Sequence, residues 1–279
     1  MKKYFLFLTL LCLSLSARAH DAEVDGIFYN LDAANKTATV TFQGDNYDSY
    51  YDEYSGDAVI PETVTYNGVT YSGTSLGEWC FAHCSSLTAI TIPNSVTSLG
   101  EWCFADCSSL TSITIPNSVT SLGDKCFANC YSLTAITIGN SVTSLGDGCF
   151  RGCSSLTAIT IPNSVTSLGS YCFSGCSSLT AIYMLPSTPP RSGNWRYDDT
   201  PLETIYVVDE DAKTAYQAHN PWSAYEIVVM PTGIEEVGTD KTAPTIVGYY
   251  DLNGKRINGK QRGAVIVRYS DGTTRKVLK

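Results

Sequence analysis

The chain has 279 residues, of which 43% are hydrophobic and 11% aromatic, enough for a packed core. These values exclude a disordered tail and a miniprotein that depends on disulfides alone. Charged residues make up only 16% of the chain, which argues against coiled coils and predicts many short strands and turns. Residues 20–237 contain 24 acidic and six basic side chains, and this negative charge predicts that they do not bind nucleic acid.

Residues 1–19 have the features of a signal peptide for secretion. Two lysines stand near the start, residues 4–15 are apolar, and a small-x-small triplet ends at Ala19. The apolar stretch is too short for an ordinary membrane span, and no later stretch approaches the roughly 20 apolar residues that one needs. We therefore predict cleavage before His20 and a secreted or outer-surface protein without a transmembrane span. A lipoprotein attached at Cys12 is the less favoured alternative, because the residue before it is not small.

Residues 20–55 are predicted to form an N-terminal β-hairpin that caps the unit after it. Two segments typical of strands, 27–31 and 37–42, are joined by a short polar turn. Repeat structures need a cap because a terminal coil would otherwise expose core side chains and unpaired strand edges. The acidic, tyrosine-rich stretch at 45–54 lacks the spacing of known calcium loops. We interpret it as a solvated loop, with a contact patch as the alternative.

Residues 56–230 contain an internal 23-residue repeat. The segment 92–114 returns with few changes at Ile115, Ile138 and Ile161, and two more degenerate copies keep the same register. A fixed period of this length is the signature of a solenoid, in which each coil buries its apolar face by stacking on its neighbours.

Each repeat is predicted to contain three short pieces. In one copy, Leu110, Ile113 and Ile115 point to one side of a half-buried strand, and residues 119–122 form a second extended piece. A glycine then turns the chain into residues 124–130, whose apolar residues have helix-like spacing and predict about two turns of helix. The expected fold class is an α/β repeat solenoid, a ladder of short parallel strands with short helical turns.

The repeat motif is similar to that of a known family. The string Cys-Phe-x-x-Cys-x-Ser-Leu-Thr-x-Ile-x-Ile-Pro-Asn-Ser-Val-Thr-Ser-Leu-Gly closely resembles the BspA-like leucine-rich repeats of bacterial and some protozoan surface proteins. Family members mostly have Ala where this chain has the first cysteine of each pair, at Cys80, Cys103, Cys126, Cys149 and Cys172. The resemblance implies a leucine-rich repeat fold and a non-enzymatic binding protein, associated with adhesion to host matrix proteins or other cells.

The end of the chain has a different organisation. A short helix is expected at 212–219, before the last coil, and a change in composition after residue 230 predicts a linker at 231–247 and a small C-terminal β segment at 248–279. The β segment resembles the C-terminal sorting segments of proteins exported by the type IX route in Bacteroidetes. The resemblance lies in the string YDLNGKR at 250–256 and in the closing string KVLK. It implies sorting to the outer cell surface.

The ten cysteines after residue 19 fall in five Cys-x-x-x-Cys pairs. An even count in an exported protein ordinarily suggests disulfides, but residues four apart on a helical turn have Cβ atoms about 5 to 6 Å apart, too far for one. Pairing between coils is not expected either, because helical segments pack about 8 to 10 Å apart. We predict buried free thiols, with some disulfides as the alternative and a metal site as a remote one.

The sequence contains no catalytic constellation, phosphate loop or zinc-protease motif. Adjacent His83 and Cys84 would point in different directions on a helical turn, so a thiol-dependent enzyme is only a remote alternative. We therefore predict no enzymatic activity, no cofactor and no metal.

The candidate contact residues lie mostly on one strand face, where a threonine recurs once in each repeat. The predicted binding residues are Thr91, Thr114, Thr137, Thr160, Tyr183 and, in an interrupted coil, Trp195. The hydroxyls could simply bond along the stack and keep the face soluble. The functional interpretation is an extended contact surface of a monomeric protein for a protein or glycan on host or neighbouring cells. An accessory glycan-binding protein is the alternative function.

Overall fold

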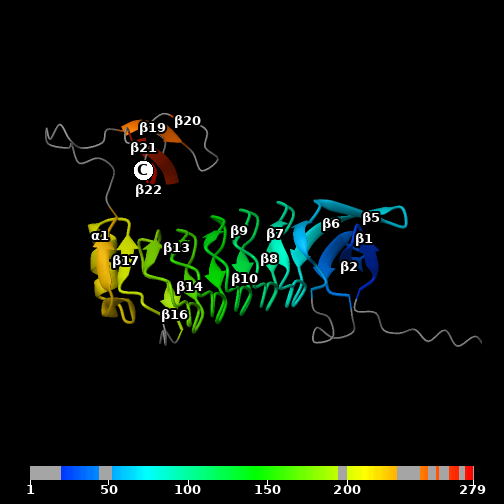
Figure 1. Cartoon of the computed structure of the whole chain (residues 1–279), viewed down its shortest axis with the longest axis horizontal. Helices are drawn as coiled ribbons and strands as arrows, with labels where there is room; N and C mark the ends of the chain where they lie inside the picture. Colours follow the sequence, from blue (N-terminus) through cyan, green and yellow to red (C-terminus); the bar gives the residue numbers. More distant parts are fainter. Residues whose placement is uncertain are drawn as a thin grey trace, which may run out of the picture.

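The computed structural model describes residues 20–43, 52–193 and 200–230, together with the backbone of four strands between 246 and 278. Over most of this length the chain winds into coils that stack along one axis, as Figure 1 shows. No helix in the described ranges has the length and hydropathy needed to span a bilayer.

Several predictions fall outside the described residues. They concern the signal peptide at 1–19, most of the tyrosine-rich stretch, Trp195 and most of the linker at 231–247.

The first strands form an antiparallel group that joins the solenoid. Strands β1 (Ala22–Val24), β2 (Ile27–Asp32) and β3 (Thr37–Thr41) pair in order, so the predicted hairpin is present. Strand β3 then pairs in parallel with β6 (Val69–Leu76), which also forms a hairpin with β5 (Thr63–Tyr66). The hairpin thus continues the solenoid's own sheet, and its role as a cap stays a prediction.

A first ladder of very short parallel strands follows from β6. Every strand except the last consists of a serine and a leucine, and it pairs with the same two residues of the neighbouring repeat. The leucines are only 2% exposed, because they point into the core. The strands of this ladder are β8 (Ser98–Leu99), β10 (Ser121–Leu122), β12 (Ser144–Leu145), β14 (Ser167–Leu168) and β16 (Arg191–Ser192).

A second set of parallel strands lies across the core from the first and forms the strand face. Its strands are β4 (Gly56–Val59), β7 (Leu87–Thr91), β9 (Ser112–Thr114), β11 (Ala135–Thr137), β13 (Ala158–Ile161), β15 (Ala181–Met184), β17 (Thr204–Val207) and β18 (Glu226–Val229). They form three separate ladders, which are β4-β7, β9-β11 and β13-β15-β17-β18. No ladder joins β7 to β9 or β11 to β13 within this described stretch.

The prediction of helical turns in the regular coils is wrong, because these segments form a row of tight turns. In the coil at 124–130, the N–H groups of Lys125, Phe127 and Asn129 donate to carbonyl oxygens of the next coil at 2.8, 2.8 and 2.7 Å. The intervening N–H groups donate to the carbonyl three residues earlier. The φ angles of Lys125 and Asn129 are 52° and 59°, which no right-handed helix contains. A helix would have kept these donors within its own coil.

Two short helical segments close the solenoid at its C-terminal end. Helix α1 (Glu210–Gln217) lies close to the predicted position, and the side chain of Asp209 caps it by accepting from the N–H of Ala212 at 2.8 Å. A 3₁₀ turn, η2 (Trp222–Ala224), follows, and its Trp222 is fully buried.

The C-terminal segment forms a separate antiparallel sheet. Its order is β20-β19-β21-β22. Strand β19 begins at Ile246, inside the linker predicted at 231–247, and the domain boundary at 248 stays a prediction. These strands are β19 (Ile246–Tyr250), β20 (Arg256–Ile257), β21 (Ala264–Tyr269) and β22 (Thr274–Leu278).

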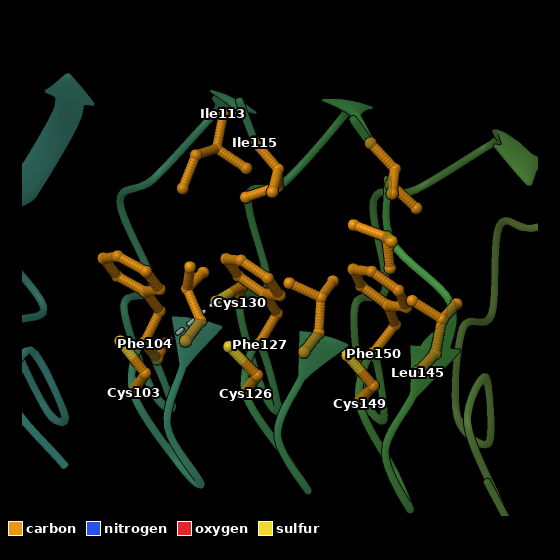
Figure 2. Close-up of a cluster of buried hydrophobic side chains, with 14 of the residues drawn as sticks. Cys103, Phe104, Ile113, Ile115, Cys126, Phe127, Cys130, Leu145, Cys149 and Phe150 are labelled. Atoms are coloured by element: carbon orange, nitrogen blue, oxygen red, sulfur yellow. Dashed lines mark hydrogen bonds between the residues drawn. The ribbon is translucent and has the colours of Figure 1, made fainter. Parts of the chain in front are cut away.

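A column of phenylalanines occupies the middle of the core, between the two sets of strands. Their rings stack nearly parallel, with centroids 5.1, 5.3, 5.5 and 5.6 Å apart, and none is exposed. Figure 2 shows the column between Ile113 and Ile115 on one side and the cysteines on the other. The column consists of Phe81, Phe104, Phe127, Phe150 and Phe173.

Truncation of the central ring tests this core. Phe127→Ala is expected to lower the free energy of unfolding by about 3 to 5 kcal/mol, because it leaves a cavity that the neighbouring coils share. Chemical denaturation measures the loss. Tyr131→Ala, at a side chain that is 49% exposed, is the control and should change stability by about 0.5 kcal/mol or less. An unchanged midpoint for the Phe127 variant would contradict the inward placement of the column.

Candidate functional site

A groove runs across the strand face over β7, β9, β11 and β13. It has a volume of about 800 Å³. Among the described residues, none that line it is charged, although residues 20–237 as a whole carry 24 acidic groups. The lining residues are Ala89, Ile90, Thr91, Ile92, Asn94, Ser112, Ile113, Thr114, Ile115, Pro116, Asn117, Ile136, Thr137, Ile138, Gly139, Asn140, Thr160, Pro162 and Leu185.

All four predicted threonines line this groove. Thr91, Thr114 and Thr137 are exposed, and Thr160 is half-buried. Thr114 pairs directly with Thr137 in the β9-β11 ladder, and Thr160 pairs with Tyr183 in the β13-β15 ladder. The structure therefore brings the predicted row together, with Tyr183 continuing it beyond the groove.

Tyr206 extends the same row, and the sequence analysis missed it. Its ring stacks on that of Tyr183, with centroids 4.8 Å apart and planes at 18°. Burial, followed by the proximity of Tyr206, raises the pKa of Tyr183. The residue could have been found by adding one repeat period to Tyr183.

The floor and rim of the groove offer two kinds of contact. The side chains of Ile92, Ile115 and Ile138 are buried beneath it and give it an apolar floor. Asparagines follow these strands in the lining, and the amide oxygen of Asn117 accepts the backbone N–H of Asn140 at 2.8 Å. Such a surface offers hydrogen-bond donors and acceptors together with apolar contact area.

Both breaks between the strand-face ladders lie along the groove. Residues on the two sides of the β7/β9 break line it, as do residues on the two sides of the β11/β13 break. The strands on either side of each break are therefore neighbours in the groove without being paired in a ladder.

Sequence comparison places the repeats in a known family. Residues 72–220, just over half of the chain, match the BspA type leucine rich repeat region in six copies. The chain belongs to the BspA-type leucine-rich repeat family. No curated protein matches the sequence.

Solved structures support the fold of this BspA-type chain. A leucine-rich repeat protein of T. pallidum is similar with a TM-score of 0.54 and 23% identity, over 67% of this chain and 84% of that one. A leucine-rich cell surface protein of Faecalibacterium prausnitzii gives 0.51 and 23%, over 91% of this chain and 59% of that one. At this identity the likeness concerns the fold alone.

A second group of side chains lies on the turn side of the BspA-type coils, and the sequence analysis missed it. The indole rings of Trp79 and Trp102 stack 4.6 Å apart, and the ammonium group of Lys125 lies 4.3 Å from the Trp102 ring centroid. The indole N–H of Trp102 donates to Glu101 at 2.9 Å. The two tryptophans and the lysine all have positive φ. All three residues occupy the same position of the 23-residue repeat, and this shared position could have identified the group from the sequence.

The remote alternative of a thiol-dependent enzyme finds no support at His83 and Cys84. The Nδ1 atom of His83 lies 3.5 Å from a carboxylate oxygen of Asp106, on the partly exposed turn side. Cys84 is 1% exposed, and burial raises its pKa to about 12. Its thiol therefore stays protonated and points into the core. Among the described residues, no group of three histidine, cysteine or acidic side chains is placed to hold a metal ion.

The ten cysteines form two buried columns, and each is a free thiol in the structure. The prediction that neighbouring coils pack about 8 to 10 Å apart is wrong. The Sγ atoms of Cys80 and Cys103, in neighbouring coils, are only 3.4 Å apart, because tight turns stack more closely than helices. In the second column, the thiol of Cys130 donates to the carbonyl of Phe104 at 3.1 Å, and the same bond recurs in the coils on either side. These bonds hold the thiols as protonated donors.

A thiol titration tests this arrangement. Burial raises the pKa of Cys176 to about 12, and it raises the pKa of Cys130 and Cys153 well above the usual range of a thiol. The thiolate needed for alkylation is therefore scarce in the folded protein at neutral pH. A chain that begins at His20 should give ten free thiols when unfolded and resist a bulky alkylating reagent when folded. A mass that shows disulfides in the freshly purified protein would contradict this prediction.

Proposed function

We propose that this protein is a non-enzymatic binding module of the outer cell surface, and that it contacts its ligand through the groove on the strand face. The observation that carries the proposal is the groove itself, since all four predicted threonines line it over four successive coils. Its described lining residues provide hydrogen bonds and apolar contact, and none of them is an acid, a base or a thiol. This composition favours binding over catalysis.

The proposed location at the outer cell surface rests on the N-terminal and C-terminal segments of the sequence. The segment at 1–19 resembles a signal peptide, and the C-terminal segment resembles a sorting segment of the type IX route. The similar F. prausnitzii structure is described as a cell surface protein. Together with the family resemblance, these features support adhesion to host matrix proteins or to other cells.

Charge placed on the threonine row tests the groove as the contact surface. Replacing Thr91, Thr114, Thr137 and Thr160 together by Lys should reduce binding by about 100-fold, and any single replacement by about threefold, because weak contacts add along a rigid row. Binding to bead-coupled matrix proteins and glycans measures the effect. Three of these threonines are exposed, so stability should fall only slightly.

The chain offers a matched control for this variant. Thr97, Thr120, Thr143 and Thr166 are also exposed and recur at the same period, but none of them lines the groove. Replacing these four by Lys adds the same charge and should leave binding within about threefold of the original. Equal losses for the two variants would mean that charge alone acts, and normal binding by the first variant would overturn the groove as the contact surface.

A further inference from the structure

The charge of the groove lining differs from the net charge of the chain that carries it. Residues 20–237 carry a strong negative charge, whereas no acidic or basic side chain lines the groove among the residues that the structure describes. An acidic ligand would be repelled by the body of the protein, and a basic one would find no partner in the groove. Charge complementarity therefore favours an uncharged ligand.

The lining combines polar and apolar side chains, and this combination favours some neutral ligands over others. Rows of threonine hydroxyls and asparagine amides lie beside an isoleucine floor, and strand backbone at two ladder breaks borders the same groove. A sugar ring presents hydroxyl groups at its edge and C–H groups on its face. Such a ring can use both kinds of contact at once.

The spacing of the coils gives a third argument. Equivalent rings in neighbouring coils are 4.8 Å apart at Tyr183, where the strands beyond the groove are paired, and 5.1 to 5.6 Å apart in the phenylalanine column of the core beneath it. An extended peptide places side chains on one face about every 6.7 Å, so it loses register with the coils within a few steps. An extended β-1,4-linked chain of six-membered sugar rings advances by about one coil per ring and keeps its register.

From charge, chemistry and spacing together, we infer that the groove binds a neutral, extended β-linked polysaccharide along the solenoid axis, with one sugar ring over each of the four coils from Thr91 to Thr160. This inference rests on the proposed function, because it assigns a ligand class to the same groove. Tyr183 and Tyr206 continue the row beyond the end of the groove.

Binding of oligosaccharides of defined length to the full chain tests the inference. The probes are neutral β-1,4-linked glucose oligomers of two to six rings, and the matched controls are α-1,4-linked oligomers of the same lengths, which have the same composition but a curved chain. Affinity for the β-linked series should rise by about tenfold or more from two to four rings and then increase only slightly. The α-linked series should bind at least about tenfold more weakly at four rings.

Two further measurements connect the binding to the groove. The double variant Thr114→Lys with Thr137→Lys should lose the gain with chain length, whereas Thr120→Lys with Thr143→Lys should keep it. Binding should be nearly the same at low and high salt, because the ligand and the groove are uncharged.

The possible results separate this inference from the function on which it rests. Affinity independent of chain length, equal binding of the two linkages, or preference for charged glycans or for an uncharged extended peptide would overturn the inference. If the quadruple threonine variant loses binding to matrix proteins while no neutral glycan binds, the proposed function stands and the inference fails. If the original protein binds neither matrix proteins nor glycans, both fail.

Discussion

The backbone hydrogen bonds between turns of neighbouring coils determine the architecture of this molecule. Every second N–H group of the turn row donates to the coil that follows, at 2.7 to 3.0 Å in the regular coils. These bonds replace the helix that a leucine-rich repeat could have had here and bring the coils to 5.1 to 5.6 Å, as measured between phenylalanine rings. Paired strands on the other side are spaced about 4.8 Å apart, but no ladder joins β7 to β9 or β11 to β13 there.

The same bonds impose a conformational cost on the sequence. Two positions in each turn row have positive φ, and glycine occupies them at Gly148, Gly152 and Gly175. Trp102 and Lys125 take the left-handed conformation as well, at a cost of about 1 to 2 kcal/mol each. The stacking of the indole rings and the contact of the lysine with Trp102 offset part of this cost. The stability of the fold therefore explains the row formed by Trp79, Trp102 and Lys125 on the turn side.

The repeat period was sufficient to predict the solenoid, the core of the regular coils and the threonine row, because identical coils must place identical residues in line. The register predicted for the last copy is wrong by one residue, since Ile205 pairs with Ile227 and not with Val228. The repeat period could not distinguish helix from turns, since Cys126, Phe127 and Cys130 face inward in either case. Helix and turns differ in whether a backbone N–H group donates to its own coil or to the next one. That depends on contacts between residues far apart in the sequence. The ladder breaks were equally invisible, as the strands on either side of them have nearly the same sequence. One local departure is visible in the sequence, since Gly139 stands where other coils have proline. In the structure, a Cβ atom at this position would clash with the carbonyl oxygen of Pro116.

Charge is distributed unevenly between the two sides of the coils, and this distribution assigns them different roles. Exposed carboxylates recur once per coil on the turn side, at Glu78, Glu101, Asp124 and Asp147. Their mutual repulsion is reduced where a carboxylate accepts a backbone N–H of the next coil, as Asp124 does from Asp147 at 2.8 Å. The turn side can therefore supply solubility for the whole solenoid. The strand face is free of that requirement, which allows its groove to combine an apolar floor with uncharged polar groups.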